Sequence, residues 1–135
     1  MPTSIGCVGI IEKEGKTLLE KRTDSDRWAF IGGGLQDDET LEQAIRREVK
    51  EETNLNVEEL LLLGVVSDPS RIIQYNDGKV KRSASVVFRA TIGDFSNMGK
   101  SEESTELKFF SRDEMEKIQL VETHLPIKEG WIQNT

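Results

Sequence analysis

The sequence is poor in cysteine and has no long apolar run. Cys7 is its single cysteine, so the chain cannot form a disulfide within itself. No apolar stretch approaches the roughly 20 residues that span a bilayer, and the first residues lack the basic and hydrophobic regions of a signal peptide. We therefore expect a soluble protein of the reducing cytoplasm, with Cys7 as a small buried hydrophobic residue rather than a nucleophile.

An excess of positive charge is also missing. The chain carries 25 acidic against 18 basic residues, which gives a formal net charge of −7. Duplex nucleic acid and anionic membranes are bound through basic surfaces, so neither is expected as a partner. An acidic protein that handles phosphates needs a local positive charge, such as a metal ion. The composition therefore favours a small-molecule partner, and it leaves open whether the chain forms a homodimer.

A length of 135 residues is typical of one domain, which we place at residues 1–135. The order of apolar patterns predicts strands, a glycine segment, a helix, further strands and a final helical region. Strands are predicted at residues 4–11, 16–22, 59–67, 71–75, 81–93 and 106–110, and helices at 40–53, 111–118 and 125–133. This order indicates the α+β class, with a mixed β-sheet flanked by helices in an α/β/α sandwich.

Turn residues and glycines refine this prediction. EKEG, residues 12–15, should join the first two strands as a hairpin, and NDG, residues 76–78, should form a second tight turn. The apolar run ELLLLGVVS, residues 59–67, is typical of a buried strand. Gly32, Gly33 and Gly34 break the strand pattern, and we expect a loop there whose backbone can approach another group closely.

Capping residues indicate both ends of the predicted helix at residues 40–53. Thr40 and Gln43 have the spacing of a capping box at its start. Asn54 follows its last turn, where asparagine can replace glycine in the left-handed conformation. Ser111 and Glu114 have the same capping spacing at the start of the next predicted helix.

Three glutamates of the first helix occupy an unexpected face. With Leu41 at zero and about 100° per residue, an apolar stripe is formed by Leu41, Ala44, Ile45 and Val49. Glu48, Glu51 and Glu52 fall within this stripe, at roughly 340°, 280° and 20°. Two charges about 6 Å apart repel by roughly 3 kcal/mol at an effective dielectric near 20, and the C-terminal half of a helix disfavours anions. A divalent cation such as Mg²⁺ would compensate, whereas the competing interpretation is a solvated, salt-bridged face.

The segment GGLQDDETLEQAIRREVKEETNL, residues 33–55, resembles the signature of the Nudix hydrolases. That signature has glycine, five residues, glutamate, seven residues, Arg-Glu, an aliphatic residue, any residue, a Glu-Glu pair, any residue, glycine and an aliphatic residue. The positions that match are Gly33, Glu39, Arg47, Glu48, Val49, Glu51, Glu52 and Leu55. Asn54 departs from it because the family has glycine there, and Ile31 replaces the proline that often precedes the glycines.

The resemblance implies hydrolysis of a nucleoside diphosphate linked to another group, with Mg²⁺ or Mn²⁺ bound. It makes Glu48, Glu51, Glu52 and the Gly33 carbonyl metal ligands, with Glu48 or Glu52 also acting on the attacking water. Arg47 would hold the glutamates in place, and Glu39 would support it. The family often adds an acid from a later loop, for which we favour Glu106 and then Glu103, over a merely solvated acidic loop.

Substrate contacts are assigned to Arg22, Gly34 and Tyr75, where the planar guanidinium of Arg22 suits a phosphate. Trp28 and Phe30 are expected in the core rather than stacked on a base, and His124 is expected to be non-catalytic. We favour a nucleoside triphosphate, including an oxidised one, as the substrate. The alternatives are ADP-ribose or another nucleotide sugar, a catalytically silent nucleotide-binding module, and an acidic interaction domain.

Overall fold

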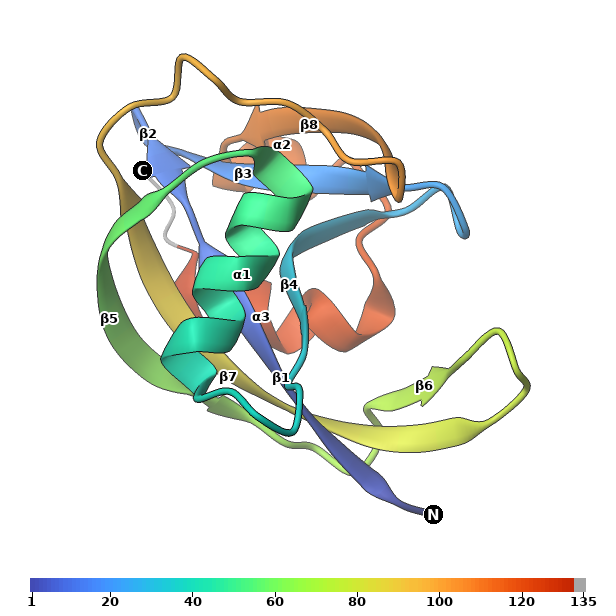
Figure 1. Cartoon of the computed structure of the whole chain (residues 1–135). Coiled ribbons are helices and arrows are strands. Elements are labelled where there is room, and N and C mark those ends of the chain that lie inside the picture. The colour runs from blue at the N-terminus through green and yellow to red at the C-terminus, as the bar shows by residue number, and fades with distance from the viewer. Residues whose placement is uncertain (133–135) are drawn as a thin grey trace.

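The computed structural model describes residues 1–132. Within that range the chain forms one eight-stranded mixed sheet with helices on both faces (Figure 1). The elements are β1 (Thr3–Ile10), β2 (Glu12–Lys13), β3 (Lys16–Arg22), β4 (Trp28–Gly34), α1 (Leu41–Thr53), β5 (Val57–Val66), β6 (Ile72–Gln74), β7 (Val80–Ile92), β8 (Ser104–Phe110), α2 (Arg112–Met115), the 3₁₀ helix η1 (Glu122–His124) and α3 (Leu125–Trp131). Gln133, the end of the last predicted helix, lies outside the described residues.

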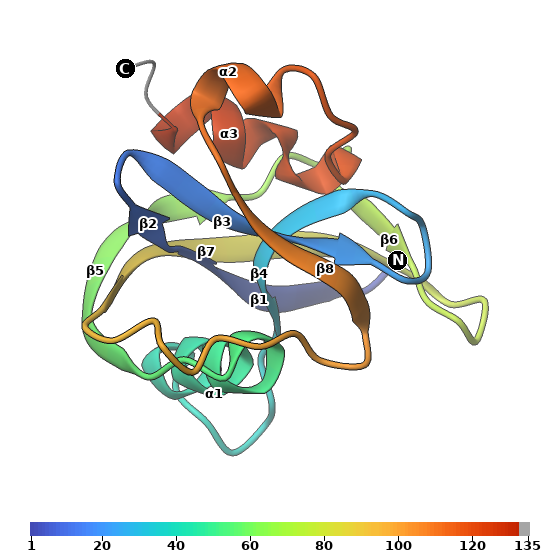
Figure 2. The same ribbon diagram turned by 90° about the horizontal axis from the view of Figure 1, so that it is seen from above.

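The sheet follows the order β2-β3-β4-β1-β7-β5, with β8 added to β3 and β6 added to β7. β1 and β7 run parallel, and the other described pairs run antiparallel. Figure 2 shows α1 against one side of the sheet and α2 and α3 against the other. The predicted α+β class and the α/β/α layering are therefore confirmed. No helix within residues 1–132 is long and apolar enough to cross a membrane.

Two apolar cores lie on the two sides of the sheet because neighbouring strand residues face opposite ways. The core under α1 includes Ile31 of β4 together with Ile45 and Val49 of the helix. The core under α2 and α3 includes Phe30, the preceding residue of β4, and Ile127 of α3. Strand β4 therefore contributes to both cores and has a rigid position in the middle of the fold.

The first predicted hairpin forms only in part. The turn at residues 14–15 joins β2 to β3, and Glu14 and Gly15 both have positive φ. β1, however, does not pair with β3 over its length, because it leaves to lie between β4 and β7. Apolar side chains of β1 contribute to both cores there.

The glycine segment was wrongly predicted to be a loop. Gly32, Gly33 and Gly34 continue β4 as extended strand and pair with Val8, Cys7 and Gly6 of β1. A Cβ atom on Gly32 would lie 2.1 Å from the Cys7 carbonyl oxygen, so a side chain there would clash with the backbone of β1. The predicted close approach of this backbone is real, and Cys7 is buried as expected.

The prediction that β5 is buried was also wrong. β5 lies at one end of the sheet and pairs on one side with β7. Leu61, Leu62 and Val65 are 57%, 62% and 57% exposed, although Trp131 of α3 packs against the strand at Gly64. A continuous apolar run cannot reveal that a strand at the end of a sheet is covered only in part.

Both ends of α1 match the sequence prediction. The Thr40 side chain accepts a hydrogen bond from the Gln43 N–H, and the Gln43 side chain accepts one from the Thr40 N–H. Asn54 has φ of 59°, and its side-chain amide donates to the Asn97 carbonyl at 2.9 Å. The helix therefore starts and stops at fixed residues, which sets the direction of the glutamates it carries.

Replacing Asn54 by alanine should destabilise the protein by about 1 kcal/mol more than replacing it by glycine. Both changes remove the bond to Asn97, but only alanine keeps a Cβ in the left-handed conformation. Urea denaturation of the two variants measures the difference. Equal stabilities would show that the backbone conformation at this cap contributes nothing.

Candidate active site

Helix α1 and strand β4 bring two carboxylates against bare glycine backbone. Glu52 is 3% exposed, and its Oε2 accepts a hydrogen bond from the Gly32 N–H at 3.0 Å. Glu48 is half-buried one turn earlier, and a Cβ on Gly33 would lie 2.5 Å from its Oε1. The absent side chain of Gly33 therefore leaves the space in which the Glu48 carboxylate lies.

The third glutamate does not join them. Glu51 has a side chain that is 57% exposed, and it reaches the site only through Arg47. The predicted stripe thus holds Glu48 and Glu52 but not Glu51, whose wheel position lies at the border of the apolar face. The exposed face of the helix carries Gln43, Arg46 and Lys50.

Arg47 fixes the cluster through all five of its N–H groups. Its Nε and Nη2 donate to the two oxygens of Glu39 at 3.0 and 2.7 Å. Its Nη1 donates to Glu48 at 2.8 Å and to Glu51 at 3.2 Å, and the second N–H of Nη2 reaches the Gly34 carbonyl at 3.0 Å. One guanidinium therefore ties the helix, the end of β4 and the loop between them into one unit.

A further carboxylate, which the sequence does not indicate, completes the cluster. Glu20 of β3 is 1% exposed, and its carboxyl group lies against that of Glu52. The Nη1 atom of Arg22 is 3.5 Å from its Oε1. The only indication of Glu20 in the sequence is that the strand segment KTLLEKR contains a single acid next to apolar residues.

Burial dominates the electrostatics of these acids. It raises the pKa of Glu52, and the neighbouring carboxylates of Glu20 and Glu48 raise it further. Burial likewise raises the pKa of Glu20 and of Glu48, while Arg22 and Arg47 act in the opposite direction on their respective partners. The site is therefore short of positive charge, and a divalent cation would restore the balance.

The donor set fits a hard cation that brings other ligands with it. Within residues 1–132, no three acidic, histidine or cysteine side chains form a ready cage. Mg²⁺ does not require one, because it is usually held by one or two carboxylates together with waters and substrate phosphates. Glu52 and Glu48 provide carboxylates, and Glu20 provides an acceptor oxygen that has no hydrogen-bond partner in this part of the chain.

A cleft of about 520 Å³ opens beside the glycines. Its walls come from β1, β4, the β6 hairpin and η1, and they include Arg22, Gly32, Gly33, Gly34 and Tyr75. The acids do not line this cleft themselves. They stand at its glycine wall, where Glu52 binds the N–H of Gly32.

The three residues assigned to the substrate all line this cleft. Arg22 is held by Asp24 through bonds of 3.3 and 3.1 Å, so its guanidinium is anchored at the mouth. Tyr75 is 40% exposed on the turn after β6. Gly34 has open space beside its Cα, while its carbonyl is occupied by Arg47. The Gly33 carbonyl, assigned to a metal, lies 3.7 Å from the Sγ of Cys7.

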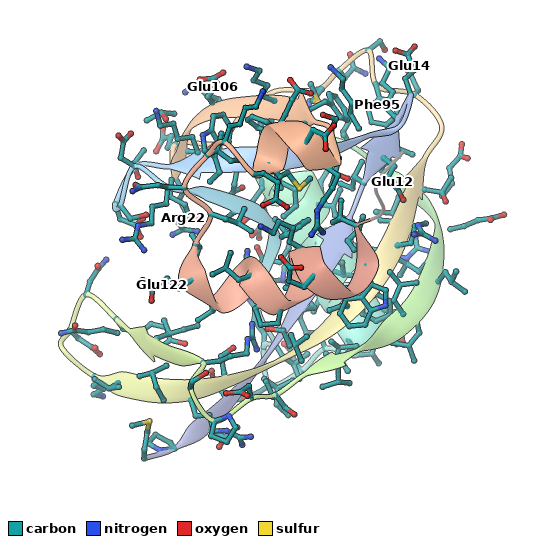
Figure 3. All side chains as sticks on the ribbon, turned by 180° about the vertical axis from the view of Figure 1, so that it is seen from behind. Glu12, Glu14, Arg22, Phe95, Glu106 and Glu122 are labelled. Carbon is teal, nitrogen blue, oxygen red and sulfur yellow. The ribbon has the colours of Figure 1, made fainter. Side chains whose placement is uncertain are left out.

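The structure does not bring Glu106 into the cluster. Glu106 of β8 is exposed and lies opposite Lys21 of β3 in the strand register, whereas Glu20 lies opposite Leu107. Because adjacent strand residues face opposite sides, Glu106 points away from the side on which Glu20 meets Glu52, and Figure 3 shows it at the periphery of the molecule. Glu103 is the nearer acid, since its charge acts on both Glu20 and Glu48.

The aromatic and histidine side chains have structural contacts. Trp28 is buried edge-on against Phe110, with ring centroids 4.7 Å apart. His124 lies at the base of the cleft, where its Nδ1 accepts a hydrogen bond from the Phe30 N–H at 3.1 Å. Both contacts agree with the expected core positions of Trp28 and Phe30.

Arg71 is a further cleft residue that the sequence did not indicate. It is 3% exposed, and it donates to the carbonyl groups of Val66, Ser83 and Thr123 and to the hydroxyl of Ser85. These bonds attach the segment between β5 and β6 to the cleft wall. An arginine in a polar loop gives no local signal of such burial.

Arg47→Lys should destabilise the protein by about 2 kcal/mol, although it keeps the charge. The lysine ammonium has three N–H donors on a flexible side chain, so it cannot replace a planar guanidinium that uses five N–H donors. Urea denaturation measures the effect, and Arg46→Lys is the matched control because Arg46 is exposed and makes one bond, to the Val57 carbonyl. Equal losses in the two variants would contradict the proposed framework role of Arg47.

Burial lowers the pKa of His124 to about 3, helped by the charges of Arg71 and Arg22. The unfolded chain binds a proton at this histidine below about pH 6.5, whereas the folded chain does not until about pH 3. The neutral imidazole therefore contributes stability above pH 6.5 that is lost as the pH falls toward 3.

His124→Asn keeps an acceptor for the Phe30 N–H and removes the titrating ring. Between pH 7 and pH 4.5 the wild type should lose roughly 2 to 3 kcal/mol more unfolding free energy than this variant. Denaturant titrations at the two pH values give the comparison. Parallel losses in both proteins would show that His124 titrates normally when folded.

Comparison with known proteins places this geometry in a family. A family model described as the NUDIX domain matches residues 1–131. An RNA pyrophosphohydrolase of Hydrogenovibrio crunogenus is 42% identical over 59 residues, which are 44% of this chain and 36% of that protein. An ADP-ribose pyrophosphatase of Methanocaldococcus jannaschii is 47% identical over 66 residues, 47% of this chain and 39% of that protein. The matches thus span less than half the length of these curated relatives.

The fold is shared over a greater length. A MutT NUDIX hydrolase of Burkholderia pseudomallei superimposes with a TM-score of 0.79 over 97% of this chain and 99% of that one, at 24% identity. The ADP-ribose pyrophosphatase and NMN adenylyltransferase of Francisella tularensis gives a TM-score of 0.73 over 93% of this chain and 39% of that one. At such identities these likenesses establish the fold alone. Because the family model covers residues 1–131, the chain belongs to the Nudix family.

Proposed function

We propose that this protein hydrolyses a pyrophosphate bond in a nucleoside diphosphate linked to another group, with Mg²⁺ or Mn²⁺ bound at the glutamates. The observation that carries the proposal is the placement of Glu48 and Glu52 against the bare backbone of Gly32 and Gly33, at the wall of a 520 Å³ cleft. A solvated, salt-bridged helix face would not bury Glu52 to 3% exposure.

Each acid has a separate part in this proposal. Glu48 and Glu52 hold the cation, and one of them accepts a proton from the attacking water. Glu51 is exposed and bound to Arg47, and its assignment as a metal ligand stays a prediction. When bound, the cation neutralises charge on phosphate oxygens and lowers the pKa of coordinated water. Gly33 offers its carbonyl, and Arg47 and Glu39 keep the carboxylates in position.

The residues that line the cleft suggest how a diphosphate substrate is oriented in it. Arg22 lies beside Glu20 at one end of β3, close to the acids, and its planar guanidinium suits a phosphate. Tyr75 lines the same cleft from the β6 hairpin and offers a ring edge and face to the nucleoside. A nucleotide with its phosphates at Gly32–Gly34 would therefore extend toward Tyr75.

We favour a nucleoside triphosphate, including an oxidised one, as the substrate. ADP-ribose or another nucleotide sugar is the alternative, and the relative named ADP-ribose pyrophosphatase supports including it. The relatives named RNA pyrophosphohydrolase add RNA as a further compound to test. We place the activity in the cytoplasm, and a homodimer stays a prediction.

Glu52→Gln should lower kcat by about two to four orders of magnitude on whichever substrate is cleaved, because it removes a charged ligand and proton acceptor. The assay is a panel of nucleoside triphosphates, nucleotide sugars and RNA with Mg²⁺, with products identified by chromatography. Glu42→Gln, an exposed change on the same helix, should retain full activity.

The second candidate function is a nucleotide-binding module without catalysis, for which the cleft alone would suffice. Binding of a nucleotide without turnover of any compound in the panel would support this candidate and contradict hydrolysis. Equal rates for the wild type and Glu52→Gln would contradict the assigned site while leaving hydrolysis in place.

A further inference from the structure

Glu20 is an unusual residue for the interior of a strand. It is 1% exposed in β3, and within residues 1–132 its Oε2 has no hydrogen-bond partner. A buried carboxylate without a donor is costly, since it loses its hydration and gains no compensating bond. Glutamine or an apolar residue would fill the same volume without that cost, so packing alone does not explain an acid at this position.

The partial compensation that Glu20 receives comes from Arg22. The distance between its Oε1 and Nη1 of Arg22 is 3.5 Å, which is at the limit of a hydrogen bond. Arg22 is at the same time bound by Asp24 through two bonds of 3.3 and 3.1 Å. One guanidinium is therefore shared between two carboxylates, and among the described residues the Oε2 atom of Glu20 is left without a partner.

The free oxygen lies in the group of acids at the glycine wall. The carboxyl group of Glu20 meets that of Glu52, and the charges of Glu48 and Glu103 also act on it. Glu52 comes from α1 and Glu20 from β3, so two separate elements present carboxylates to one another. Carboxylates from different elements that face each other are a common arrangement of oxygen ligands around Mg²⁺ or Mn²⁺.

We propose that Glu20 is a ligand of the same divalent cation that Glu52 binds, so that strand β3 and helix α1 hold the ion between them. This inference rests on the metal-dependent site proposed above and adds a ligand that lies outside residues 33–55. The competing explanation is that Glu20 and Glu52 share a proton, with no contact between Glu20 and a cation. The two explanations differ in what glutamine at position 20 would do.

The test is Mn²⁺ binding to the full chain without nucleotide, followed by the electron paramagnetic resonance signal of free Mn²⁺. Glu20→Gln should weaken the affinity by about tenfold or more, as should Glu52→Gln. Glu106→Gln is the matched control, because Glu106 lies on the neighbouring strand and faces the other way, and it should leave the affinity unchanged.

Thermal unfolding separates a ligand from a structural residue. Without metal, Glu20→Gln should unfold at the same temperature as the wild type or higher, because it removes a buried charge. With Mn²⁺, its melting temperature should rise by less than that of the wild type. If Glu20→Gln does not fold, Glu20→Asp, which keeps the charge but shortens the reach, should show the weakened Mn²⁺ affinity instead.

Wild-type affinity for Mn²⁺ in Glu20→Gln would overturn the inference and favour the shared proton, since glutamine can donate to Glu52. That result together with nucleotide hydrolysis would leave the proposed function standing. Weakened Mn²⁺ binding in Glu20→Gln without turnover of any nucleotide would support the inference and contradict the proposed function.

Discussion

The contact between helix α1 and the glycine end of β4 is the constraint on which the site depends. The Gly32 N–H holds one oxygen of Glu52 at 3.0 Å, and the missing side chain of Gly33 makes room for Glu48. A side chain at Gly33 would displace the Glu48 carboxylate or push α1 away from β4, and one at Gly32 would clash with the backbone of β1. Because β4 is packed between two apolar cores, neither element can move to relieve such a clash.

Charge is concentrated at this contact and balanced by two arginines. Arg47 uses all of its N–H groups to bind Glu39, Glu48, Glu51 and the Gly34 carbonyl. It therefore balances negative charge on the outer side of the helix. Arg22 is divided between Glu20 and Asp24 on the strand side. Glu52, between these two groups, has a single backbone donor, so the deficit of positive charge is greatest at the buried centre of the cluster.

Much of the architecture follows from local patterns. The periodicity of residues 41–53 and the capping residues Thr40 and Asn54 predicted α1 and the inward direction of Glu48 and Glu52. The boundary position of Glu51 could not be resolved, because its exposure depends on how far the sheet extends beneath the helix. Such an outcome depends on tertiary contacts that the helix sequence does not contain.

Long-range pairing accounts for the other differences. Gly32–Gly34 have a composition typical of a loop, but they form a strand because β1 offers a pairing partner, against which a side chain at Gly32 would clash. The role of Glu20 could not be predicted for the same reason, because nothing in KTLLEKR indicates that β3 passes close to Glu52. The opposite direction of Glu106 follows from the register of β8 on β3, which two short strands do not specify on their own.

The exposure of β5 has a consequence for the behaviour of the protein at high concentration. β5 is a strand at the end of the sheet whose apolar residues Leu61, Leu62 and Val65 are exposed, and chains can aggregate at such an edge. Two features counteract this tendency. Register shifts between Val57 and Glu59 and between Leu62 and Gly64 interrupt the regular ladder of hydrogen bonds. Glu58 and Glu59 place negative charge at the start of the strand. Colloidal solubility therefore rests on a few irregular and acidic positions.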